Sequence, residues 1–160
     1  MTMLHAAAAA LLLLQPAAAK PAAPKPSATA QKPPAAAPKP AADALSVTLT
    51  YKGKGTVDDN HKLIAWVFAD PNVTSGSRPI ATQSTGKNGA TVTFTGLPAT
   101  PVYVFAAFDQ KGGYDGVSGP PPAGIPTGLY SKAPKGPALA VKAGGPALKL
   151  TFDDSQPWNK

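Results

Sequence analysis

The sequence predicts an all-β domain, a seven-stranded antiparallel β-sandwich, and three observations support this fold class. Beyond residue 44, short apolar segments recur at about ten-residue spacing and are separated by glycine- and proline-rich turns. No segment shows the apolar periodicity of a helix. The 160-residue chain contains no glutamate and only 14% charged residues, so strong helix formers are scarce. Because parallel strands need crossover segments, usually helices, a mostly parallel sheet is excluded.

The first three predicted strands differ in how many of their faces are apolar. Leu45–Tyr51 alternates apolar and polar residues, which predicts a strand with one face in water. Leu63–Ala69 is apolar at every position, as expected of a strand at the centre of a sandwich. Pro79–Thr85 is polar and begins with a proline, which favours the edge of a sheet.

The other four predicted strands are separated by glycine-containing turns. Residues 86–89 predict a tight turn whose Asn-Gly pair tolerates positive φ. Ala90–Thr95 alternates again, and Val102–Asp109 is the second strand with two apolar faces. Leu139–Lys142 and Leu148–Phe152 flank a Gly-Gly-Pro turn and predict a closing hairpin.

The two tryptophans have different expected environments. Trp66 lies between apolar residues within a strand, so it is expected in the core rather than as a platform for a ligand. Trp158 follows Pro157 in the C-terminal tail, residues 155–160, and is expected to be a loosely packed residue rather than part of a site.

The first 19 residues are predicted to be a signal peptide. Ala6–Leu14 is an apolar run that is too short for the roughly 20 residues of a spanning helix but suits an export signal. Small residues before Lys20 predict cleavage after Ala19, although the first residues include no lysine or arginine. A buried alanine- and leucine-rich helix is the alternative. The mature chain is expected in the periplasm or outside the cell, without a membrane span.

Residues 20–44 are predicted to be a disordered linker to a domain at residues 45–154. The linker is rich in proline, alanine and lysine, and Lys-Pro occurs in it four times. Such sequences favour polyproline II, which rises about 3.1 Å per residue, so a semi-stiff spacer is expected. Docking of this segment to a proline-binding partner is the alternative.

Charge and cysteine content exclude several function classes. The net charge is +7, but four lysines lie in the linker and the other basic residues are scattered. A nucleic-acid binder concentrates its basic residues in a patch or stripe, so no nucleic-acid partner is expected. The chain has no cysteine, which excludes disulfides, thiolate nucleophiles and cysteine-ligated metals.

The sequence predicts no catalytic residues. The mature chain has one histidine, His61, within the run Asp58-Asp59-Asn60-His61. Acid–base catalysis needs a titrating group with a partner that orients it. Consecutive polar residues between two strands are instead expected to solubilise a turn, and no nucleophile elbow or phosphate loop is present.

One loop has the outline of a calcium site. In a calcium-binding loop, alternate residues that carry oxygen ligands surround the cation at a glycine bend. The loop that resembles this outline contains Asp109, Lys111, Gly112, Gly113 and Asp115. Lys111, however, places a cation where a ligand belongs, and no glutamate closes the loop. Asp109 and Asp115 are therefore the metal candidates, calcium is the one cofactor considered, and no cofactor is predicted.

The chain resembles a bacterial family of small exported proteins of unknown function. The resemblance rests on NGATVTFTGLPATPVYVFAAFDQKGGYDG and GIPTGLYS, and above all on Gly-Leu-Pro at 96–98 and Gly-Ile-Pro at 124–126. It implies a prealbumin-like, immunoglobulin-like sandwich of the kind found in carboxypeptidase regulatory domains. The family carries His-Asp-x-Asn-x-Asn-Gly between these segments, whereas this chain has Phe108, Gln110 and Lys111 at the histidine and two polar positions. The family's cation site is therefore not carried over.

These observations favour a non-catalytic, exported accessory or binding module whose partner, a protein or a glycan, is not identified by the sequence. One alternative is carbohydrate binding with Tyr114 and Tyr130 as stacking platforms. These tyrosines could instead cover the open end of the sandwich. The other alternative is a protein–protein interaction through the predicted edge strand Pro79–Thr85.

Overall fold

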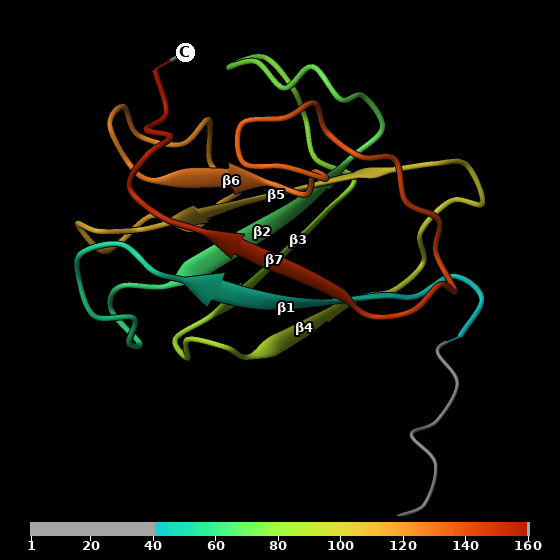
Figure 1. Cartoon of the computed structure of the whole chain (residues 1–160), viewed down its shortest axis with the longest axis horizontal. Helices are drawn as coiled ribbons and strands as arrows, with labels where there is room; N and C mark the ends of the chain where they lie inside the picture. The colour runs from blue at the N-terminus through green and yellow to red at the C-terminus, as the bar shows by residue number, and fades with distance from the viewer. Residues whose placement is uncertain (1–40, 160) are drawn as a thin grey trace, which may run out of the picture. The chain divides into compact units, whose positions relative to one another are not determined.

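The computed structural model describes residues 41–159, which form seven β-strands in two sheets (Figure 1). The strands are β1 (Leu45–Tyr51), β2 (Leu63–Phe68), β3 (Ala81–Thr85), β4 (Thr91–Phe94), β5 (Tyr103–Phe108), β6 (Thr127–Leu129) and β7 (Leu148–Phe152). These described residues include no helix, which confirms the all-β prediction, and hence no helix long and apolar enough to cross a membrane. The predicted signal peptide and residues 20–40 of the linker lie outside the described residues.

The strands are divided into a three-stranded and a four-stranded sheet. The strand orders are β4-β1-β7 and β3-β2-β5-β6. β2 and β5 are the central strands of the larger sheet and β3 is one of its edges, so the predicted positions of all three are confirmed. The order differs from that of the immunoglobulin constant domain, in which the first, second, fourth and fifth strands share a sheet.

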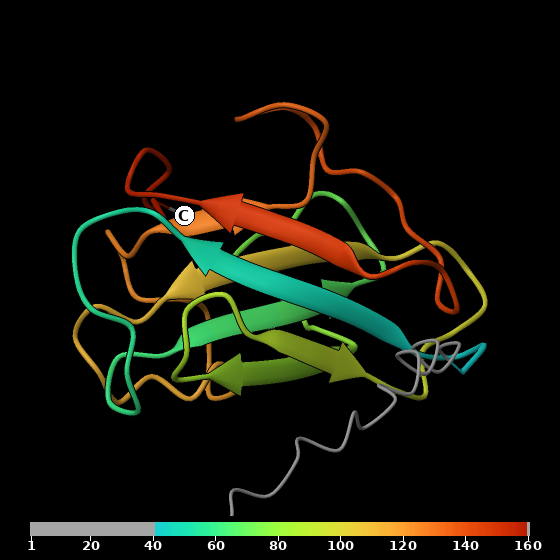
Figure 2. The same cartoon turned by 60° about the horizontal axis from the view of Figure 1, so that its bottom comes forward.

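The sandwich is not wholly antiparallel, so the prediction was wrong for one strand pair. β7 runs parallel to β1, with pairs from Val47–Leu148 to Tyr51–Phe152, as the adjacent arrows in Figure 2 show. A parallel pair needs a connection of a dozen or more residues. Here the pair joins the first and last strands, and the connection between them, residues 52–147, contains the other five strands.

The predicted closing hairpin is also wrong. Leu139–Lys142 forms no strand, and Val141 instead exchanges two backbone hydrogen bonds with Val102, at 2.8 and 2.9 Å. The sheets still contain seven strands because the sequence analysis missed β6, which pairs with β5. Gly128, at the centre of β6, has no side chain, so the sequence there lacks the alternation of apolar and polar residues that indicates a strand. A glycine is required there because a Cβ would overlap the ring-bearing Cβ of Phe152.

The turn at residues 86–89 joins two sheets rather than two paired strands, since β3 and β4 lie in different sheets. Gly89 has φ of 78°, as the sequence predicts, but Asn88 does not adopt positive φ. The Asn88 side chain instead accepts a hydrogen bond from the Tyr51 N–H and donates one to the Tyr51 carbonyl, both at 2.8 Å. The side chain thereby takes the place of a backbone partner at the end of β1.

The inner core lies between the two sheets. In β1 the buried positions alternate as predicted, and in β2 the residues Leu63, Ala65 and Val67 point inward. The residues of this inner core are Leu45, Val47, Leu49, Tyr51, Leu63, Ala65, Val67, Val92, Phe94, Leu97, Val102, Val104, Ala106, Phe108, Leu148, Leu150 and Phe152. Each is buried, and burial of this apolar surface is the main favourable term in folding.

A second apolar cluster covers the opposite face of the four-stranded sheet. The alternate residues of β2, together with Ala107 of β5, point outward and meet side chains from two loops and the C-terminal tail. We call this set the outer cluster; it contains Ile64, Trp66, Phe68, Val73, Ala107, Ile125 and Trp158, with Phe105 and Tyr114 packed against it. Trp66 is 4% exposed, so its predicted place in a core is confirmed.

Tyr51 links the ends of β1 and β7. Its hydroxyl donates to the Asp154 carboxylate and also lies 3.0 Å from the Lys54 carbonyl oxygen. The second Asp154 oxygen accepts the Lys54 N–H at 2.8 Å. Burial, reinforced by the bond to Asp154, raises the pKa of Tyr51 to about 12.

Candidate functional site

A cavity of about 730 Å³ opens over the outer cluster. Its aromatic lining comes from Trp66, Phe68, Phe105, Tyr114 and Trp158. The loop from β2 to β3 and the loop after β5 complete the walls with residues 73–82 and 116–121. In Figure 1 the loop from β2 to β3 and the C-terminal tail both lie at the top of the view. We call this site the aromatic cavity.

The loop after β5 is held against the sheet by Gly116. Its φ is +77°, and a Cβ there would lie 2.6 Å from Cγ2 of Ile64, so the close approach requires glycine. The Trp66 indole N–H donates to the Gly116 carbonyl at 2.6 Å. The contact fixes the floor of the cavity and leaves Trp66 with its only donor in use.

Asp109 and Asp115, the two metal candidates, anchor this loop. Asp109 is 2% exposed and its two oxygens accept the backbone N–H groups of Gly112 and Tyr114, at 3.0 and 2.8 Å. Asp115 accepts from the N–H groups of Val117 and Ser118 and from the Ser118 hydroxyl. These hydrogen bonds lower the pKa of Asp115 to about 2.

This geometry gives both carboxylates a structural role. Within residues 41–159 no group of three or more histidine, cysteine or acidic side chains could hold a metal ion. The Asp109 oxygens face N–H groups of their own loop, which are donors and not cation-binding groups. The residues present therefore offer a poor fit to calcium, which needs six to eight oxygen ligands.

The two candidate ligand-binding tyrosines lie in different places. Tyr114 lines the aromatic cavity, with its ring centre 6.2 Å from that of Trp66 and its hydroxyl donating to the Gly119 carbonyl at 2.8 Å. Burial, with the nearby Asp115 and Asp109 charges, raises the pKa of Tyr114 to about 12. Tyr130 packs against the inner core and lines a separate hollow.

The rim of the aromatic cavity carries exposed apolar side chains. Among the described residues, the large hydrophobic side chains that are exposed are Ile80, at 43%, and Val117, at 67%. Both line this cavity. Contiguous exposed apolar surface beside polar residues marks interaction sites more often than single scattered residues do.

Trp158 lines the aromatic cavity and is the residue of the candidate site that the sequence analysis missed. The prediction of loose packing was wrong, because its side chain is only 8% exposed. Its backbone is held by a bond from its N–H to the Ile125 carbonyl and one from Gly124 N–H to its carbonyl, at 2.9 and 2.8 Å. The indole N–H is buried and has no hydrogen-bond partner within residues 41–159. Pro157, next to Trp158, forms a β-bridge with Pro126 and so brings the C-terminal tail onto the sheet. This proline is the one feature of the sequence that could have indicated the position of Trp158.

His61 and Asp58 form a pair that the sequence analysis did not expect. The Asp58 Oδ1 lies 2.9 Å from the His61 Nδ1 and also accepts the backbone N–H groups of Asn60 and His61. These hydrogen bonds, led by that from the His61 N–H, lower the pKa of Asp58. Both side chains are partly exposed, and in the described part of the chain no hydroxyl is hydrogen-bonded to the imidazole. The pair caps a turn and has no nucleophile to activate.

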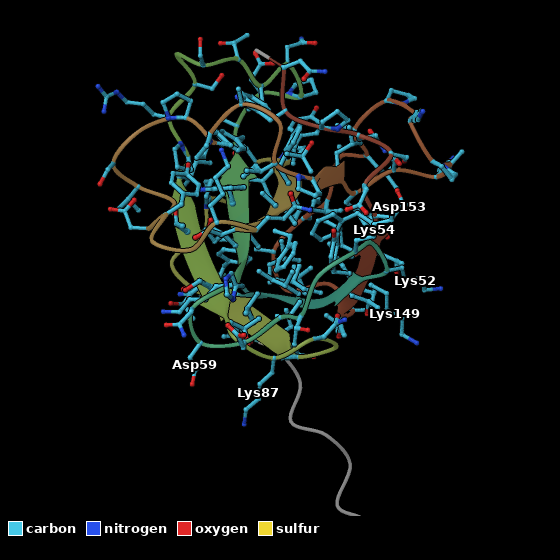
Figure 3. All side chains as sticks on the ribbon, turned by 90° about the vertical axis from the view of Figure 1, so that its left-hand side faces the viewer. Lys52, Lys54, Asp59, Lys87, Lys149 and Asp153 are labelled. Carbon is cyan, nitrogen blue, oxygen red and sulfur yellow. The ribbon has the colours of Figure 1, made fainter. Side chains whose placement is uncertain are left out.

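Lysines gather near the hollow beside Tyr130. Figure 3 shows Lys52, Lys54 and Lys149 on one side of the sandwich together with Asp153. Lys52, Lys149 and Asp153 line a hollow of about 350 Å³. Charges of both signs on exposed positions are typical of a solvated surface.

Comparisons with protein-family models, with curated proteins and with solved structures find no match for this chain.

Proposed function

We propose that this protein is a non-catalytic, exported binding module and that the aromatic cavity is its ligand site. One observation carries the proposal: the exposed side chains of Ile80 and Val117 line the cavity together with Trp158, whose buried indole N–H has no hydrogen-bond partner among the described residues. Leaving a buried donor without a partner costs about 1–3 kcal/mol. A ligand that accepts this hydrogen bond would recover that cost.

The dimensions and chemistry of the cavity support this role. Ligand pockets commonly measure about 300–1,000 Å³ and combine aromatic walls with a few polar groups. The aromatic cavity falls within this range. Its tyrosine and one of its two tryptophans have their donors bonded to loop carbonyls, so these walls are rigid and present mainly apolar surface.

The proposal of export rests on the N-terminal sequence, and the fold type on the resemblance described above. We propose a signal peptide at residues 1–19, a spacer at 20–44 and a prealbumin-like sandwich. The N-terminal residue of the protein recovered from a bacterial periplasm tests the first of these. Lys20 is expected, and an intact Met1 in material that stays in the cytosol would overturn export.

NMR of the ¹⁵N-labelled full-length chain tests the ligand site. Small aromatic, saccharide and peptide fragments are expected to shift the indole signal of Trp158 and the amide signals of residues 114–118. Val117→Asp should abolish these shifts, because it places a charge on the apolar rim. Thr151→Asp, exposed on the other sheet, is the matched control. Fragment shifts that cluster elsewhere, or survive Val117→Asp, would overturn the site.

The absence of catalysis is tested separately with His61. We expect no turnover of ester, peptide or glycoside substrates, because the His61–Asp58 pair has no hydroxyl or thiol to activate. Turnover by wild-type protein that is lost in His61→Ala would show that the protein is an enzyme.

Carbohydrate binding is the second candidate, and the position of Tyr114 favours it. Tyr114 shares the cavity with Trp66, and aromatic faces stack on the apolar faces of sugar rings. Tyr130 does not line the aromatic cavity, so of the two predicted stacking platforms only Tyr114 belongs to this site. Binding on a glycan array that is lost in Tyr114→Ala would support this candidate, and a silent array would remove it.

A further inference from the structure

We propose that the aromatic cavity binds a lysine- and proline-rich segment in the polyproline II conformation, supplied by residues 20–40 of a second copy of this protein. This inference rests on the proposed function, since it names the ligand of the same cavity. It is carried by the hydrogen-bonding balance of the cavity, by its apolar surface, by the charge beside it and by the sequence of residues 20–40.

The hydrogen-bonding balance favours a ligand that offers acceptors. The indole N–H of Trp158 is a buried donor without a partner, whereas the donors of Trp66 and Tyr114 are bonded to loop carbonyls. A polyproline II segment exposes its backbone carbonyls and makes no internal hydrogen bonds. Its prolines have no N–H, so they bring no donor that the cavity would have to satisfy.

The apolar surface suits proline rings. Grooves that recognise polyproline II are lined by aromatic side chains, against which the rigid rings pack at low entropic cost. Five aromatic side chains line this cavity, and the exposed Ile80 and Val117 extend its apolar surface at the rim. The rim therefore continues the surface along which an extended segment would lie.

The charge beside the cavity suits lysine. Asp115 is exposed and lines a neighbouring hollow, which shares Tyr114 with the aromatic cavity. Asp70, also exposed, follows the lining residue Phe68 by two positions. Arg78, which lines the cavity, carries the same charge as lysine and opposes it, so a bound lysine has to lie nearer these carboxylates than Arg78. A lysine next to a bound proline could pair with Asp115 or Asp70, an interaction that salt would screen.

The chain itself contains a sequence of this chemistry. Residues 20–40 carry Lys-Pro four times, at Lys20, Lys25, Lys32 and Lys39. In polyproline II geometry, about 20 residues extend roughly 60 Å, which is enough to reach a cavity on a neighbouring molecule. Each copy offers one cavity and one segment, so two copies can exchange segments reciprocally. The second contact is then intramolecular, which strengthens a weak single-site interaction.

The test begins with a synthetic peptide of residues 20–40. It is added to a ¹⁵N-labelled full-length chain in which the seven prolines between 21 and 40 are replaced by serine, so that the N-terminal segment cannot compete. We expect the indole signal of Trp158 to shift more than that of Trp66, whose donor is already bonded. A peptide with serine in place of every proline should give no shift. Equal or absent shifts of the two indoles would overturn the inference.

Variants of the same serine-substituted chain test the contacts. Trp158→Phe keeps an aromatic face but removes the N–H, so peptide affinity should fall about tenfold. Asp115→Asn should weaken binding less and reduce its dependence on salt. Tyr130→Phe, outside the cavity, should bind the peptide unchanged. Unchanged affinity in Trp158→Phe would overturn the assigned hydrogen bond, and the wild-type indole shifts decide the case if this variant does not fold.

Sedimentation tests the source of the segment. The wild-type chain should form a concentration-dependent dimer, and the serine-substituted chain should remain monomeric. A wild-type chain that stays monomeric although the peptide binds would overturn the second copy as the source. Fragments that bind the cavity when the peptide does not would overturn this inference while leaving the proposed function standing. If neither binds, the proposed function fails too.

Discussion

Replacing each tryptophan by phenylalanine should have different consequences for stability, although both residues belong to the outer cluster. Either change removes ring atoms whose burial is worth about 1 kcal/mol. Trp66→Phe also leaves the buried Gly116 carbonyl without its donor, at 2.6 Å in the wild type, which adds about 1–3 kcal/mol. Trp158→Phe instead removes a buried N–H that has no partner, and this gain of about 1–3 kcal/mol offsets the lost burial. We therefore expect destabilisation of about 2–4 kcal/mol for Trp66→Phe, and for Trp158→Phe a change between zero and about 2 kcal/mol of stabilisation.

Urea unfolding followed by circular dichroism measures this difference. The slope of the free energy of unfolding against urea concentration should be the same in both variants, since the exposed surface hardly changes. The midpoint should fall for Trp66→Phe only. Equal losses in the two variants, or a larger loss for Trp158→Phe, would refute the reasoning. Such a result would mean that the indole N–H of Trp158 has a partner in solution.

Three further predictions concern the strand ends and the loop. Gly128→Ala should destabilise the fold by about 1–3 kcal/mol, measured by urea unfolding, because the added Cβ overlaps Phe152. Tyr51→Phe should cost about 1–2 kcal/mol through the lost bonds to Asp154 and to a loop carbonyl. Because the folded-state pKa of Tyr51 is raised from 10.0 to about 12, this advantage of the wild type should be full below pH 10 and lost as the pH rises towards 12, in unfolding curves taken from pH 8 upward. The pKa of Asp115, about 2, lies below its ordinary value of 3.8. The stability that this carboxylate contributes should therefore be present above pH 4 and lost as the pH falls towards 2. The amide signals of the loop should follow that change in the wild type but not in Asp115→Asn.

Each of these has a control in the chain. Gly119→Ala adds a Cβ with no atom within 4 Å and should leave stability almost unchanged. Tyr103→Phe removes a hydroxyl that has no hydrogen bond among the described residues, so it should not cause the loss of stability expected for Tyr51→Phe. A Gly128→Ala protein as stable as Gly119→Ala would contradict the close packing of β6 on β7. Loop signals of Asp115→Asn that change between pH 4 and 2 as in the wild type would assign that change to another group.

The fold was predictable wherever local pattern decides the structure. The alternation of Leu45–Tyr51 and the two apolar faces of Leu63–Phe68 mark one partly exposed strand and one central strand, and both follow from the period of two along a strand. The parallel pairing of β7 with β1 was not predictable, because it joins residues about a hundred positions apart. β6 was missed since Gly128, which the packing requires, removes the pattern that marks a strand.

The candidate site was predictable only in part. Tyr114 was expected to contact a ligand and does line the aromatic cavity, whereas Tyr130 lies elsewhere. The cavity also requires Trp66 and Trp158, which are far apart in the sequence and meet only because the tail folds back over the sheet. Sequence patterns report neighbours along a strand, so they do not report a site that tertiary contacts assemble.

Because β2 packs on both of its faces, alternate residues of this one strand serve the packing between the sheets and the lining of the aromatic cavity. Substitutions at Leu63, Ala65 and Val67 act on the contact between the sheets, and those at Ile64, Trp66 and Phe68 act on the cavity side. Variation at the second set can alter what the cavity accepts while the sheet-to-sheet packing is retained. The scaffold can therefore acquire new binding preferences by changing alternate residues of a single strand.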